Sequence, residues 1–192
     1  MKSLKFLSIL FLSALAFTSC SSDDDNPEAV NEEELITTVT VVYTSADGSD
    51  VVTLEYQDLD GDGPAQATIS EPGVFAQNTT YYGDVTFLNE SVSPVEDITE
   101  EVLEEGDEHQ LFYQVTGTLN AITYDDGLVN YDSNGFPIGL QSVFTTTDAA
   151  SGTITIVLRH QPNKDEEGVS DGDITNAAGS TDASVSFDAI VQ

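Results

Sequence analysis

The sequence predicts an all-β protein, a single immunoglobulin-like β-sandwich of about eight strands with one short acidic helix. Apolar residues recur mostly with a period of two, and clusters of Gly, Asp, Asn and Pro separate the alternating stretches. A period of two places apolar side chains on one face of a strand. Only one stretch has helical spacing, and about eight short strands in one domain are typical of a sandwich.

The first two strands are expected on either side of a tight turn. Apolar and polar residues alternate at 38–43 and again at 52–56, after the pair Asp47-Gly48 that suits a hairpin. Further strands are expected at 80–88, 110–116, 119–124, 140–146, 153–159 and 183–191.

The short helix is expected at 93–106. Ser93 and Pro94 have the residue types of a helix N-cap and first helical position. Val95, Ile98 and Val102 then fall on one helical face before Gly106. The other faces are rich in glutamate, and bound cations would remove the repulsion between glutamates four residues apart.

The N-terminus predicts export and lipid attachment. Lys2 and Lys5 precede the apolar run 6–17, and small residues then lead to Cys20, the single cysteine. The run spans roughly 18 Å, too short for a hydrocarbon core of roughly 30 Å. Residues 17–20 resemble the lipobox of bacterial lipoproteins, which implies a signal peptide at 1–19 and an N-terminal lipid on Cys20. The alternative is an ordinary secretory signal with an incidental cysteine.

An acidic segment follows the cysteine, consisting of Ser21, Ser22, Asp23, Asp24 and Asp25. It resembles the export signal of Bacteroidetes surface lipoproteins, which implies the outer membrane with the domain facing the cell surface rather than the periplasm. The alternative is an acidic linker, extended because like charges repel. Both interpretations predict a disordered tether at 20–34 before the β-sandwich domain at 35–192.

The charge of the chain excludes nucleic acid as a partner. The sequence has 35 acidic and 4 basic residues, a formal net charge of −31. Removal of the leader would leave Arg159 and Lys164 as the basic residues. Such a field repels nucleic acid, and also anionic lipid head groups unless divalent cations bridge them. Membrane contact is therefore expected through the lipid anchor.

The strongest metal candidate is the loop that contains Asp58, Asp60 and Asp62. Carboxylates at alternate positions of a glycine-containing loop bring oxygens to one point, and Ca²⁺ takes six to eight oxygens at about 2.3–2.6 Å. The spacing resembles the opening half of an EF-hand or dockerin loop, although Ile69 replaces the glutamate at the twelfth position. The alternative is a polar turn whose aspartates cap backbone amides.

A weaker metal candidate combines an imidazole with nearby carboxylates. His109 follows Glu104, Glu105 and Asp107, and imidazole with oxygen donors suits zinc or another transition metal. His160, at the end of a predicted strand, is the second imidazole. The alternative is a solvated acidic face with two surface histidines.

The sequence predicts a binding module and no enzyme. It has no Gly-x-Ser-x-Gly elbow, no glycine-rich phosphate loop and no His-Glu-x-x-His pair. The expected function is capture of a cation or small ligand at the cell surface, with an outer-membrane transporter as the candidate partner. The alternative is a structural or adhesive surface protein without a specific ligand.

The whole chain, with its leader and the segments 58–64, 96–101 and 170–175, is similar to small acidic flavobacterial lipoproteins of unknown function. Some of these carry the label "type 1 periplasmic binding fold superfamily protein". That fold has two α/β lobes and needs alternating helices and parallel strands, whereas this sequence has one plausible helix. The resemblance therefore implies where the protein is located in the cell and leaves its activity open.

Overall fold

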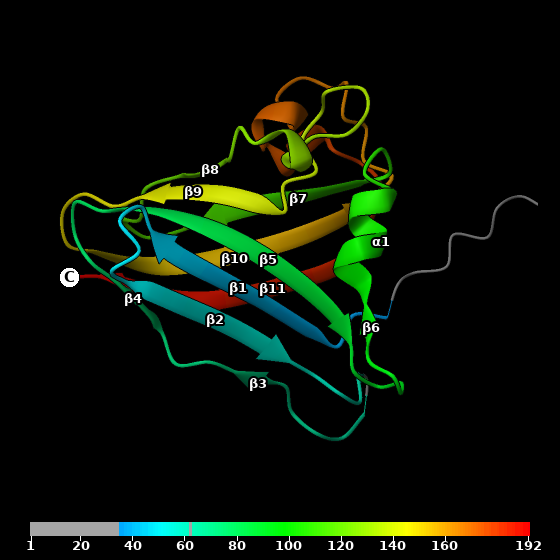
Figure 1. Ribbon diagram of the computed structural model, residues 1–192, viewed down its shortest axis with the longest axis horizontal. Coiled ribbons are helices and arrows are strands. Elements are labelled where there is room, and N and C mark those ends of the chain that lie inside the picture. The colour runs from blue at the N-terminus through cyan, green and yellow to red at the C-terminus, as the bar shows by residue number, and fades with distance from the viewer. Residues whose placement is uncertain (1–34, 62) are drawn as a thin grey trace, which may run out of the picture. The chain divides into compact units, whose positions relative to one another are not determined.

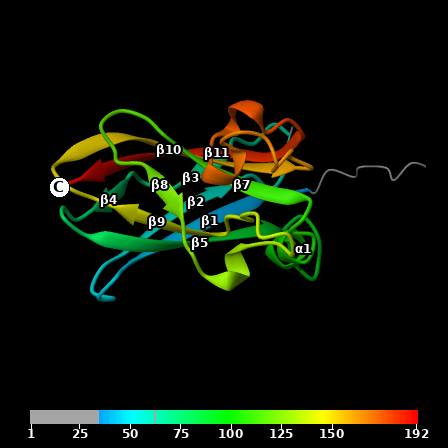
Figure 2. The same cartoon turned by 90° about the horizontal axis from the view of Figure 1, so that it is seen from above.

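The protein folds as two β-sheets packed face to face (Figures 1 and 2). The structure is a computed structural model, and it describes residues 35–61 and 63–192. The prediction of an all-β sandwich with one α-helix is confirmed. The predicted signal peptide, Cys20, the acidic export segment and the tether at 20–34 lie outside the described residues.

The described residues form eleven strands and one α-helix. The strands are β1 (Thr38–Ser45), β2 (Val51–Gln57), β3 (Thr68–Ile69), β4 (Gly73–Phe75), β5 (Thr80–Asn89), β6 (Glu96–Asp97), β7 (His109–Val115), β8 (Ile122–Tyr124), β9 (Gln141–Thr145), β10 (Ala150–His160) and β11 (Ser180–Val191). The helix α1 is Ile98–Glu104, and the 3-10 helices are η1 (Leu128–Asn130), η2 (Val169–Asp171) and η3 (Ile174–Asn176).

The strands divide into sheets A and B. Sheet A has the order β3-β2-β1-β5-β9-β8, with β6 paired to β5, and sheet B has the order β4-β11-β10-β7. Neighbouring strands are antiparallel except for β4, which lies parallel to β11. The inward residues of both sheets form one apolar core.

All eight predicted strands are present, whereas β3, β4 and β6 were not predicted. These three contain only two or three residues, too few to show an alternation. The segment predicted at 119–124 is regular only from Ile122, and just before it the side chain of Asn120 donates to the Thr145 carbonyl at 2.7 Å.

The start of the predicted helix was wrong. Residues expected in its first turn instead form β6, where Asp97 lies opposite Leu88 of β5. Asp97 then caps α1, and its side chain accepts the N–H of Thr99 at 3.0 Å. Pairing with β5 therefore overrides the local capping signal at Ser93 and Pro94.

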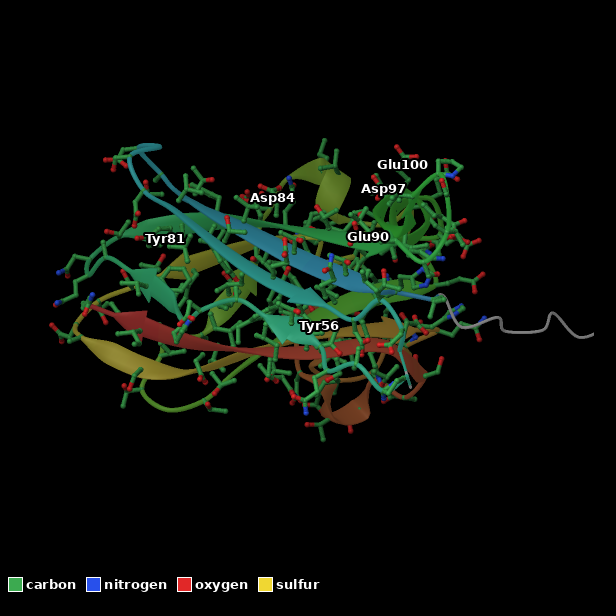
Figure 3. The ribbon with its side chains drawn as sticks, turned by 90° about the horizontal axis from the view of Figure 1, so that it is seen from below. Tyr56, Tyr81, Asp84, Glu90, Asp97 and Glu100 are labelled. Atoms are coloured by element: carbon green, nitrogen blue, oxygen red, sulfur yellow. The ribbon has the colours of Figure 1, made fainter. Side chains whose placement is uncertain are left out.

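Helix α1 lies at one end of the sandwich, beside the end of β5 (Figure 1). Figure 3 shows Asp97 and Glu100 at this end and Tyr81 towards the other end of β5. The connection 161–179 between β10 and β11 lies over the outer face of sheet B, where Val169 and Ala177 pack on Phe112 and Val157 (Figure 2). None of the described helices is long and apolar enough to cross a membrane.

The ring of Phe75 joins the aromatic residues of the core. It makes edge contacts with Tyr43, Tyr81 and Phe144, at centroid distances of 5.4, 5.2 and 5.1 Å. We expect Phe75→Ala to lower the free energy of unfolding by about 3–5 kcal/mol, as measured by urea denaturation. The control Val74→Ala, at an exposed position of the same strand, should cost less than about 1 kcal/mol. Equal losses would contradict this account of the core.

Candidate functional site

The ends of two neighbouring strands bring the histidines together. His109 is the first residue of β7 and His160 the last of β10, and the strand register places them opposite each other. Their ring centroids are 4.7 Å apart. The two side chains are 0% and 9% exposed, so the interpretation of two surface histidines is wrong. Alternation along the strands points both rings inward, on the same face as Leu111 and Leu158 of the core.

A β-bulge in β11 places the side chain of Asp182 next to the two histidines. Leu158 lies opposite Ala183 and Arg159 lies opposite Thr181, so Asp182 is the extra residue of β11. A bulge re-aims a side chain relative to the regular alternation. The Asp182 side chain is fully buried, and its carboxylate lies against both histidines.

The three side chains form a compact group, which we call the histidine–aspartate cluster. Oδ2 of Asp182 lies 3.8 Å from Nε2 of His109, and Oδ1 lies 4.0 Å from Nδ1 of His160. One ligand atom from each residue lies within 4.8 Å of the others. Within 35–61 and 63–192 this is the one group of three or more such side chains close enough to share a metal ion.

Each imidazole has a second partner on the side away from Asp182. Nδ1 of His109 lies 3.2 Å from the main-chain oxygen of Glu105, at the end of α1. Nε2 of His160 lies 3.3 Å from Oε2 of Glu108, which also accepts from Gln161 at 2.8 Å. Hydrogen bonds from Gln161 and then His160 lower the pKa of Glu108. The Glu108 side chain is half exposed and connects the cluster to solvent.

The acidic residues predicted to accompany His109 do not join it through their carboxylates. The described cluster contains no side chain of Glu104, Glu105 or Asp107. Glu105 contributes its main-chain oxygen, and Asp107 accepts the Ser133 hydroxyl at 3.0 Å. The sequence singled out both histidines, which the structure brings together, but not Asp182, which lies 73 positions beyond His109 and has no motif around it.

The aspartate loop predicted to bind calcium is described only in part. Asp62 lies outside the described residues. Oδ2 of Asp60 accepts the N–H of Ala65 at 3.1 Å, as the polar-turn alternative expects. Oδ2 of Asp58 accepts from Tyr56 at 3.4 Å, while its buried Oδ1 makes no hydrogen bond within the described residues. Calcium binding by this loop stays a prediction.

The side chain of Lys164 connects three loops beside the cluster through hydrogen bonds. Its ammonium donates to the Gly106 carbonyl at 2.6 Å, to Oδ2 of Asp132 at 3.0 Å and to the Pro137 carbonyl at 3.1 Å. Burial lowers the pKa of Lys164, and the nearby Asp132 carboxylate opposes that shift. The side chains of Lys164 and Asp132 are almost fully buried, so each charge depends on the other.

Comparison of the chain with protein-family models, with curated proteins and with solved structures finds no match. The resemblance to flavobacterial lipoproteins therefore stays a prediction. The chemistry of the site follows from the geometry of its own residues.

Replacing Lys164 tests the buried ion pair. We expect Lys164→Met to lower the free energy of unfolding by about 3–5 kcal/mol, because the Asp132 carboxylate stays buried without its cation. The double variant with Asp132→Asn should recover part of this loss, since the amide keeps an oxygen for the N–H groups of Asn134 and Phe136. Urea denaturation of the two variants measures both effects. No recovery in the double variant would contradict a dominant role for the pair.

Proposed function

We propose that this chain is a lipid-anchored protein of the outer membrane whose β-sandwich is a non-enzymatic module that binds a divalent cation. The address is supported by the sequence, through the leader 1–19, Cys20 and the acidic segment that follows. The binding function is carried by one observation: three side chains of the metal-ligand type meet inside an apolar core.

The cluster supplies donors that suit a cation. Asp182 offers a carboxylate and the two histidines offer imidazoles, and these ligand atoms lie within 4.8 Å of one another. Asp182 has its two oxygens directed at two imidazoles, and Glu108 extends from the cluster to solvent. A capture protein beside an outer-membrane transporter needs a site that a cation can reach, and the half-exposed Glu108 provides the contact with solvent.

The aspartate loop is the second place where a cation is proposed. Asp58 and Asp60 offer carboxylates at alternate positions, and the unused Oδ1 of Asp58 is available as an oxygen ligand. Ca²⁺ suits this loop because its donors are oxygens, whereas the histidine–aspartate cluster offers nitrogens as well. The proposal therefore includes both sites, and variants at each separate them.

Thermal unfolding of the full-length chain in detergent tests the proposal, with Ca²⁺, Mg²⁺ and Zn²⁺ added separately. An ion at 100 times its dissociation constant should stabilise the protein by about 2.7 kcal/mol and raise the midpoint by several degrees. Asp182→Asn should abolish a shift that arises at the cluster, whereas Asp60→Ala and Asp62→Ala should abolish one that arises at the loop. The control Asp188→Asn, at an exposed position of the strand that holds Asp182, should change neither.

The absence of any shift with all three ions would refute the binding function. The remaining interpretation would then be a structural or adhesive surface protein, whose acidic surface associates with other surfaces only weakly and in a manner screened by salt.

A further inference from the structure

We infer that the histidine–aspartate cluster is a site for Zn²⁺ or a chemically similar transition-metal ion, bound by His109, His160 and Asp182. Glu108 is the residue that positions His160. The inference rests on the proposed function and names the class of cation that the site takes.

The tautomer of His109 is set by the end of α1. The main-chain oxygen of Glu105 can only accept a hydrogen bond, so Nδ1 of His109, 3.2 Å away, carries the hydrogen. In the neutral ring this leaves the lone pair on Nε2, the atom directed at Asp182. A metal-bound histidine commonly donates its other ring N–H to a carbonyl or carboxylate in this way.

His160 is oriented in the corresponding manner by Glu108. The carboxylate of Glu108 accepts a hydrogen bond from Nε2, which leaves the lone pair of neutral His160 on Nδ1. Nδ1 is buried, makes no hydrogen bond within the described part of the chain, and lies 4.0 Å from Oδ1 of Asp182. Two imidazole lone pairs and one carboxylate therefore point into the same space.

The separations in the cluster are close to those between ligands of one metal ion. Oδ2 of Asp182 lies 3.8 Å from Nε2 of His109, and Oδ1 lies 4.0 Å from Nδ1 of His160. Two ligands each about 2.1 Å from a tetrahedral zinc ion lie about 3.4 Å apart. The three ligand atoms of the cluster lie within 4.8 Å of one another, so inward movement of at most about 1.4 Å brings every pair to that spacing.

The donor set selects the class of ion. Ca²⁺ and Mg²⁺ take oxygen ligands, six or more in number, and the cluster offers one carboxylate and two nitrogens. Imidazole suits zinc, copper, iron and nickel. Three protein ligands leave a coordination position for water, and the half-exposed Glu108 lies on the solvent side of His160.

Calorimetry and X-ray absorption on the full-length chain in detergent test this inference. We expect one Zn²⁺ per chain, bound at least about 100-fold more tightly than Ca²⁺ at the same site. The absorption spectrum of the zinc-loaded wild-type protein should show scattering from two imidazoles. Asp182→Asn, His109→Gln and His160→Gln should each weaken zinc binding, whereas the control Asp188→Asn should not. The absorption spectrum is taken on the wild-type protein, so it tests the zinc ligands even if one of the variants fails to fold.

The outcomes separate this inference from the proposed function. Binding of Ca²⁺ that is lost in Asp60→Ala, with no zinc held by imidazole, would overturn the zinc assignment and leave the cation-binding function standing. Binding of zinc without imidazole scattering would also overturn it. A chain that binds none of the ions would refute both.

Glu108 provides a separate test of the positioning role. We expect Glu108→Ala to weaken zinc binding by about 10–100-fold without changing the stoichiometry, because His160 loses the partner that fixes its tautomer. The matched control is Glu100→Ala, which removes an exposed carboxylate from α1 at the same end of the sandwich (Figure 3). If Glu108→Ala and Glu100→Ala weakened zinc binding equally, Glu108 would act only through its charge and would not position His160.

Discussion

The end of the sandwich beside α1 buries ionisable side chains in an apolar interior, and this constraint determines how the chain is arranged there. A buried charge is tolerated only with an opposite charge or enough hydrogen bonds. Lys164 meets Asp132 and two carbonyls, and Asp132 also accepts two backbone N–H groups. The loop after α1, the segment 132–137 and the connection 161–179 are thereby held in fixed positions for the histidine–aspartate cluster.

The elements predicted from the sequence are those whose signal lies in their own residues. Strands such as β1 and β10 are long enough for a period of two to be visible, and the sandwich follows from their number. The bulge at Asp182 could not be predicted in this way. It is a mismatch in register between β10 and β11, and no property of Asp182 or its neighbours indicates which residue a partner strand will skip.

Helix α1 and the two histidines also show that long-range strand pairing cannot be predicted from local sequence. The capping residues at Ser93 and Pro94 are a valid local signal, but the pairing of Asp97 with β5 places the first turn four residues later. His109 and His160 were identifiable as candidates because imidazole is rare in this sequence. Their meeting depends on the register of β7 with β10, which is a long-range property that composition and spacing do not contain.

The position of β11 has a consequence for how the chain acquires its structure. This strand lies between β4 and β10, so sheet B cannot be completed until residues 180–191 have been synthesised. Its contacts with β4 join residues more than a hundred positions apart, and such pairings form late because a long loop must close first. The histidine–aspartate cluster needs β7, β10 and β11 together, so it is complete only after this last strand has joined the sheet.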